Sequence, residues 1–125
     1  MIHLDTNFLV LALAAGSAED RRLRNWLRAE ETLGVSAIVW SEFLCGPVEA
    51  RHVELVKVVV KDPIPFLVQD AEVSARLFNF TGRRRGTLTD CMIAATAIRQ
   101  GAALATANVD DFRGFEPHGL RLSEH

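Results

Sequence analysis

Acidic residues stand at unusual places in this sequence of 125 residues. Asp90 falls in the first turn of the alanine-rich stretch 86–97, where apolar residues at helical spacing predict a buried helix. An unpaired carboxylate in such a helix is costly, because it loses its hydration. Asp90 therefore either complements the helix dipole at the surface or faces other acids around a metal ion. Asp5 and Glu42 also lie beside apolar runs and are likewise either surface acids or members of a metal-binding cluster.

Carboxylates held close together repel one another, so a cluster of them is tolerable only with a counter-charge. Oxygen ligands without His or Cys favour Mg²⁺ or Mn²⁺, which also bind water and substrate phosphate. Such a site lowers the pKa of a bound water and stabilises charge on a transferring phosphoryl group. The expected metal ligands and catalytic residues are Asp5, Glu42 and Asp90, completed by at least one of Asn108, Asp110 and Asp111, with Asp111 preferred.

Polar side chains near these acids are candidates for orienting the ligands or a bound water. Thr6 and Asn7 follow the first acid, Thr87 precedes Asp90, and Thr106 closes the last apolar run. Each of the four also fits an ordinary role as a helix cap or turn residue. We therefore keep both roles open for them.

The basic residues suggest where a nucleic acid would bind. Twelve of the 14 are Arg, which binds phosphate bidentately, although a GC-rich genome explains the same preference for Arg over Lys. Because the net charge is −2, any attraction for nucleic acid must come from a local patch. Arg83, Arg84 and Arg85 form such a patch in the loop before Asp90. The alternative is a solvated arginine run without a ligand.

Strands that alternate with helices must position these residues. Strands are predicted at 1–4, 34–39, 64–68 and 102–106, with a fifth at the edge at 120–122. This order indicates one α/β domain over residues 1–125, with a mostly parallel sheet covered on both faces. In such sheets ligands bind beyond the carboxyl ends of the strands. Asp5, Glu42 and the acids after 106 follow strands, and Asp90 opens the helix before one, which favours a shared site over scattered surface acids.

Other classes of protein fit the sequence poorly. Two cysteines are too few for a disulfide scaffold and are expected to be buried thiols, and four scattered histidines lack zinc-ligand spacing. The apolar run 8–15 is too short to span a membrane and lacks the basic flank of a signal peptide. We therefore expect a cytoplasmic protein that does not bind membranes.

Four blocks carry a resemblance to PIN-domain ribonucleases: LDTN at 4–7, SEFLCG at 41–46, LTDCMIAATA at 88–97 and LATANVDDF at 104–112. Their spacing in a short chain resembles the VapC-type toxins of toxin–antitoxin pairs. The resemblance implies a three-layer α/β/α fold with a sheet of four to five strands. It also implies an Mg²⁺- or Mn²⁺-dependent endoribonuclease that forms a homodimer and is silenced by a VapB-type antitoxin.

The family's three core acids fall on Asp5, Glu42 and Asp90. Many PIN domains have a fourth acid where this chain has Asn108, whereas other VapC-like members place it directly before the Phe, here at Asp111. An acidic pocket open to solvent would receive a basic side chain of the antitoxin, whose apolar residues are expected in a groove lined by the early helices. The alternative function is a catalytically silent PIN-like binding module, which would have no need of three repelling carboxylates.

Overall fold

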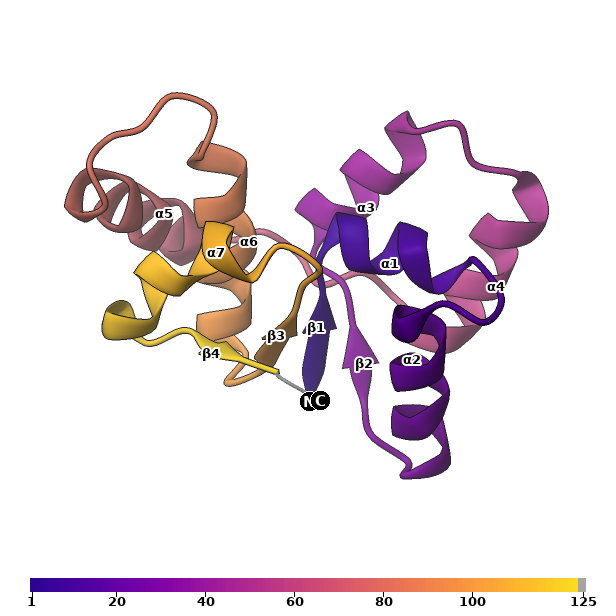
Figure 1. Ribbon diagram of the computed structural model, residues 1–125. Helices are drawn as coiled ribbons and strands as arrows, with labels where there is room; N and C mark the ends of the chain where they lie inside the picture. Colours follow the sequence, from indigo (N-terminus) through magenta and orange to yellow (C-terminus); the bar gives the residue numbers. More distant parts are fainter. Residues whose placement is uncertain (124–125) are drawn as a thin grey trace.

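The computed structural model describes residues 1–123, in which four short strands form one parallel sheet. The strands are β1 (Ile2–Leu4), β2 (Leu33–Gly34), β3 (Ala103–Ala105) and β4 (Arg121–Leu122). They lie in the order β2-β1-β3-β4, and every neighbouring pair is parallel (Figure 1). The chain leaves β1 towards β2 and later returns to its other side as β3. The carboxyl end of β1 is therefore the switch point at which α/β proteins bind ligands.

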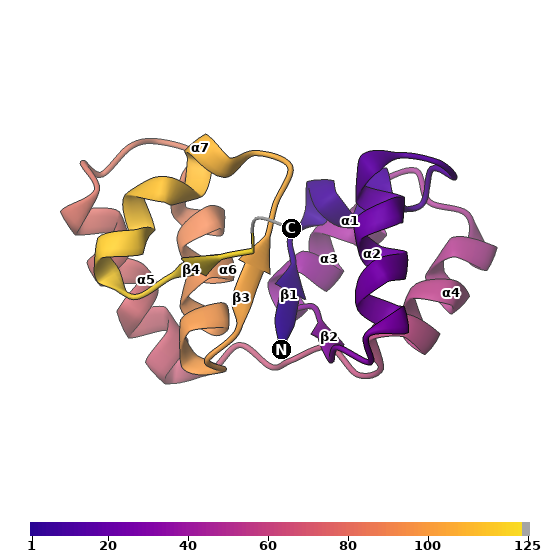
Figure 2. The same cartoon turned by 60° about the horizontal axis from the view of Figure 1, so that its bottom comes forward.

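Helices cover both faces of this sheet. Figure 2 shows α3, α5 and α6 behind the strands, with α2 nearer to the viewer. The predicted α/β/α class and the edge position of the last strand are thereby confirmed. The helices are α1 (Thr6–Ala12), α2 (Ala18–Arg28), α3 (Ala37–Cys45), α4 (Ala50–Val60), α5 (Val68–Phe80), α6 (Leu88–Arg99) and α7 (Val109–Phe112), followed by the 3-10 helix η1 (Arg113–His118).

The helix α6 packs along α5 and against β3. Its Ala94 and Ala97 are fully buried, and small side chains at these positions let the helix approach its neighbours closely. Leu4 of β1 and Leu104 of β3 are equally buried, and because Leu104 pairs with His3 rather than with Leu4, the two side chains point to opposite faces of the sheet. The core thus fixes the start of α6, which carries Asp90, relative to the ends of β1 and β3.

The predicted strand 34–39 is wrong beyond its first residue. β2 ends at Gly34, and Ser36 is the N-cap of α3, where its hydroxyl oxygen accepts a 3.1 Å hydrogen bond from the backbone N–H of Val39. The β-branched residues at 38 and 39 are therefore helical, because capping and packing outweigh their preference for strands. Glu42 accordingly lies inside α3 rather than just after a strand.

The predicted strand 64–68 is also wrong. Only one bridge forms there, between Ser36 and Ile64, because prolines at 63 and 65 cannot donate to a ladder. α5 already begins at Val68. Of the two cysteines, Cys91 is buried as expected, whereas Cys45 at the end of α3 is exposed. No helix within residues 1–123 is long and apolar enough to cross a membrane.

Candidate active site

Asp5 joins the end of β1 to the start of α1. As the N-cap of α1, it accepts a 2.7 Å hydrogen bond at Oδ1 from the backbone N–H of Phe8. Its Oδ2 accepts a 2.5 Å hydrogen bond from the hydroxyl of Thr106, which follows β3. Asp5 is only 4% exposed, so its carboxylate is held in one place by both strands.

One cavity of about 110 Å³ brings the three predicted core acids together. Asp5 comes from the end of β1, Glu42 from the middle of α3 and Asp90 from the first turn of α6. Thr6, Asn7 and Ile93 complete the lining. The structure therefore places the predicted acids around one space, and their chemical roles remain a prediction.

The pKa values of two acids respond to this crowding. Burial, followed by the negative charges of Asp111, Glu42 and Asp5, raises the pKa of Asp90 to about 6. Burial also raises the pKa of Asp5, although the hydrogen bonds from Thr106 and Phe8 oppose the rise. Without a counter-charge, the pKa of Asp90 thus lies much closer to neutral pH than its ordinary value.

Two of the predicted threonines contact the core acids. The hydroxyl of Thr6 donates a 2.6 Å hydrogen bond to Oε1 of Glu42. Thr106 donates to Asp5 and accepts a 2.9 Å hydrogen bond from the backbone N–H of Asn108. Thr87 instead donates to the backbone carbonyl of Arg84, at 2.7 Å, and so braces the loop before α6.

A second cavity, of about 160 Å³, shares Asp90 with the first. Asp111 lines this second cavity, and Asn108 lines neither. Of the three predicted arginines, Arg84 alone lines it. Phe115 was not predicted as a site residue, because its place depends on how η1 folds back. The full lining is Thr81, Arg84, Thr87, Asp90, Asp110, Asp111, Gly114 and Phe115.

The donors fit Mg²⁺ or Mn²⁺ in type, because they are carboxylate and hydroxyl oxygens. Within residues 1–123, no three His, Cys, Asp or Glu side chains are already placed to hold a metal ion. Glu42 is the exposed member of the core, and the hydrogen bond from Thr6 is the one side-chain hydrogen bond that it makes in the described part of the chain. A turn of this exposed side chain would bring its carboxylate to a ligand set with Asp5 and Asp90.

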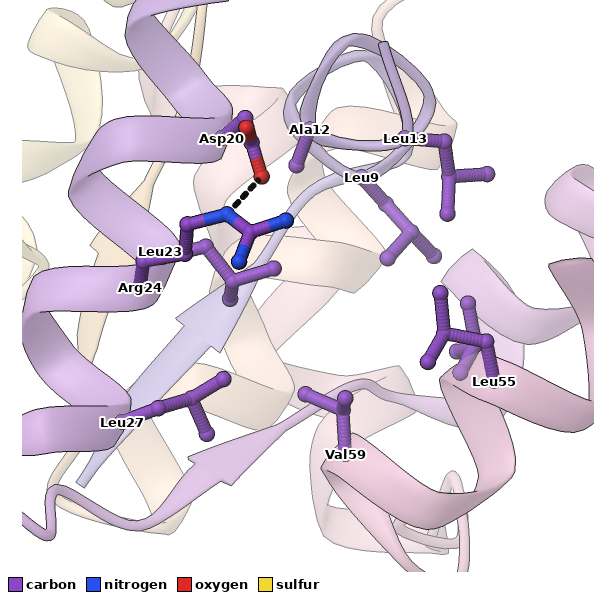
Figure 3. Close-up of a pocket in the computed structure, with 10 residues that line it drawn as sticks. Leu9, Ala12, Leu13, Asp20, Leu23, Arg24, Leu27, Leu55 and Val59 are labelled. Atoms are coloured by element: carbon purple, nitrogen blue, oxygen red, sulfur yellow. Dashed lines mark hydrogen bonds and ion pairs between the residues drawn. The ribbon is translucent and has the colours of Figure 1, made fainter. Parts of the chain in front are cut away.

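An apolar groove of about 170 Å³ lies between α1, α2 and α4 (Figure 3). Leu27 of α2 and Leu55 of α4 stand on its sides and are 42% and 53% exposed. Asp20 and Arg24, joined by a 2.9 Å ion pair, add charge at one side. The expected groove on the early helices is therefore present, but α4 as its third wall was not predicted. The remaining lining residues are Leu9, Ala12, Leu13, Leu23, Val56 and Val59.

The model of the PIN domain family matches residues 2–115, so the chain belongs to the PIN domain family. No curated protein sequence matches it. Among solved structures, the fold is similar to a chain of the VapBC2 complex from Rickettsia felis bound to a DNA fragment from their promoter. The identity is 22%, the TM-score is 0.73, and 98% of each chain is covered.

Two further structures share the fold. A chain of VapBC-1 from nontypeable Haemophilus influenzae is 22% identical, with a TM-score of 0.73, and the match covers 98% of this chain and 97% of that one. A chain of a toxin–antitoxin complex from Klebsiella pneumoniae is 24% identical, with a TM-score of 0.72, over 91% of this chain and 92% of that one. At these identities the likeness establishes the PIN fold.

Proposed function

We propose that this PIN-domain protein is a metal-dependent endoribonuclease, the VapC-type toxin of a type II toxin–antitoxin pair. The observation that supports this most is the single cavity lined by Asp5, Glu42 and Asp90 at the switch point of the sheet. Burying or crowding carboxylates costs stability, as the raised pKa of Asp90 indicates. A structural role would not require three such groups in one cavity.

Asp5, Glu42 and Asp90 would hold Mg²⁺ or Mn²⁺, with Asp111 as the fourth acid. An ion bound there supplies positive charge for phosphoryl transfer and lowers the pKa of a bound water. Hydrolysis adds water to phosphorus, breaks the P–O3′ bond and leaves the proton on the departing 3′ oxygen. The products therefore carry a 5′-phosphate and a 3′-hydroxyl.

The surrounding residues orient this set. Thr106 and the start of α1 fix both oxygens of Asp5, so that its direction is settled before any ligand binds. Thr6 holds Glu42 beside the cavity. The exposed arginines of the loop before α6 add local positive charge for an RNA backbone, because the net charge of the chain provides none.

The proposed partner is a VapB-type antitoxin whose C- or N-terminal segment lies in the apolar groove. α1 has seven residues and spans about 10 Å. Thr6 at its start lines the acidic cavity, and Leu9 and Ala12, one and two turns later, line the groove. One segment can therefore place apolar side chains in the groove and a basic side chain beside Asp5. The relatives above, solved as VapBC or toxin–antitoxin complexes, support this choice of partner.

We further propose that the chain forms a homodimer and acts in the cytoplasm, as its resemblance to VapC-type toxins implies. Sedimentation velocity of the purified chain tests the dimer. A monomer at all concentrations would contradict it without bearing on the nuclease.

The nuclease is tested by incubating the purified chain with a pool of cellular RNA in Mg²⁺, Mn²⁺, Ca²⁺ or EDTA and sequencing the new ends. We expect cleavage in Mg²⁺ or Mn²⁺ alone, with 5′-phosphate ends. Asp5→Asn, which can still cap α1, should abolish it. Products with 2′,3′-cyclic phosphates would overturn the proposal, because they form by attack of the RNA's own 2′-hydroxyl.

The silent binding module is distinguished by the same samples. It predicts that the wild type and Asp5→Asn bind the antitoxin and RNA equally and that neither cuts any RNA of the pool under any metal condition.

A further inference from the structure

The second cavity lies directly beside the proposed catalytic cavity, and Asp90 is their common wall. A single-stranded RNA whose phosphodiester reaches the first cavity must continue on both sides of it. The cavity that contains Arg84 is the neighbouring hollow on the Asp90 side. The residues of this second cavity are therefore placed to contact an RNA that occupies the first one.

The backbone of Arg84 is held at the edge of this cavity by Thr87. The backbone N–H and the hydroxyl of Thr87 both donate to the carbonyl of Arg84, at 3.2 and 2.7 Å. Within residues 1–123 its guanidinium has no hydrogen-bond or ion-pair partner, so its donors are available to a ligand. Arg83 and Arg85 do not line the cavity. One arginine of the run is thus placed differently from its two neighbours.

The other polar groups of the cavity are acceptors. The hydroxyl of Thr81 is committed to the carbonyl of Leu77, at 2.6 Å, as that of Thr87 is to Arg84, so both oxygens have lone pairs to offer. Asp111 and Asp110, the latter 3.7 Å from Nε of Arg113, add carboxylates. Among the lining residues, a small free anion would meet one cation, Arg84, beside these carboxylates. A ribonucleotide suits the cavity better, since it joins one phosphate to hydroxyl and amino donors.

Gly114 lines the cavity beside Thr81. A Cβ built on Gly114 would be in van der Waals contact with Cγ2 of Thr81, at 3.8 Å. A bulkier side chain at this position is therefore expected to reduce the space in the cavity. Gly114 has no positive φ, so a substitution there changes the space without straining the backbone.

We propose that this second cavity binds the ribonucleotide next to the scissile phosphodiester, with Arg84 holding its phosphate. The proposal rests on the nuclease function proposed above and adds a one-sided substrate subsite to it. Arg83 and Arg85 then contribute general attraction alone.

The test compares binding of short single-stranded oligoribonucleotides of random sequence, labelled with fluorescein, by anisotropy in Ca²⁺ at several salt concentrations. Arg84→Ala should weaken binding about ten-fold at low salt and lower the salt slope by about 0.7, the value for one phosphate contact on a single strand. Arg84→Lys should restore part of the loss. Arg85→Ala, from the same loop, should weaken binding less than two-fold.

Gly114→Leu supplies a variant that leaves every charge in place. We expect it to weaken binding as much as Arg84→Ala, with an unchanged melting temperature. A further RNA, whose cleavage position has been mapped, carries a neutral methylphosphonate on one side of the scissile bond. The wild type and Arg84→Ala should bind this RNA with equal affinity.

Equal losses for Arg84→Ala and Arg85→Ala, in a wild type that binds and cuts RNA, would overturn the subsite alone. A Gly114→Leu variant that binds RNA as tightly as the wild type would also overturn the subsite alone. A wild type that binds no RNA in any condition would overturn the proposed nuclease together with its subsite.

Discussion

The hydroxyl of Thr106 donates a 2.5 Å hydrogen bond to Oδ2 of Asp5, across 101 positions of sequence. The hydroxyl oxygen of Thr106 also accepts a hydrogen bond from the backbone N–H of Asn108. This one buried hydroxyl therefore joins the ends of β1 and β3 to the loop before α7. Burial raises the pKa of Asp5, and this bond opposes the rise. Thr106 therefore helps to keep a buried carboxylate charged and oriented.

Replacing this threonine tests its role. Thr106→Val keeps the shape but leaves Asp5 and the N–H of Asn108 without their partner, so we expect the free energy of unfolding to fall by about 1–3 kcal/mol. The pKa of Asp5 should rise further, which carbon-detected NMR titration measures. Thr106→Ser should recover most of both effects. A valine variant as stable as the wild type would contradict the prediction.

Asp90→Asn should stabilise the metal-free protein at neutral pH. The folded pKa of Asp90, about 6, lies above its ordinary value of 3.8, so its contribution to stability is present below about pH 4 and is lost as pH rises through 6. At pH 7.5 in EDTA we expect the variant to melt several degrees higher, a gain of about 1–2 kcal/mol. At pH 4 the two proteins should melt alike.

Mn²⁺ should raise the melting temperature of the wild type more than that of Asp90→Asn, because the ion binds the native state through the acids. A wild type that melts identically in Mn²⁺ and EDTA, with a variant that melts lower at both pH values, would make Asp90 a structural acid.

The contribution of His3 to the free energy of unfolding should depend on pH in the opposite direction to that of Asp90. It is 1% exposed, its Nε2 has no partner within residues 1–123, and burial, Arg99 and the N-terminal amine lower its pKa to about 4. The unfolded chain takes up this proton first, so the contribution of His3 is lost as pH falls from about 6.5 to 4, by roughly 3 kcal/mol. His3→Leu should flatten the slope of unfolding free energy against pH in that window. An unchanged slope would refute it.

The groove makes a prediction about the antitoxin. Leu55→Glu places a charge on the apolar wall and should weaken the complex by at least about ten-fold. Val58→Glu, on the same helix, is the control, because Val58 is 78% exposed and does not line the groove. Isothermal titration with the antitoxin measures both. Equal affinities for the two variants would place the partner elsewhere.

The convergence of Asp5 and Asp90 was predictable, because both lie next to the ends of strands in a parallel sheet. Asp5 ends a strand, and Asp90 opens the helix that leads to the adjacent one. The position of Glu42 was predicted for a wrong reason. Ser36 caps a helix over residues that prefer strands, so Glu42 reaches the cavity from within α3. For a short apolar run, the hydrophobic pattern alone does not distinguish a buried strand from a buried helix.

The second cavity was not predictable as a unit. The arginine run was visible in the sequence, but the choice of Arg84 depends on a loop in which Arg83 has a φ of 54° and Thr87 binds back to the carbonyl of residue 84. Gly114 and Phe115 reach the cavity through a 3-10 turn that no periodicity signals. Loops and turns are set by contacts between distant segments, which local propensity does not encode.

Both outer strands of the sheet, β2 and β4, have two residues each. A longer edge would present a row of free N–H and C=O groups on which another chain could add a strand. These short edges leave little room for such pairing, and just past the end of β2 the bridge between Ser36 and Ile64 already pairs the backbone. We therefore expect partners of this protein to bind through side chains on its helices rather than by adding a strand to its sheet.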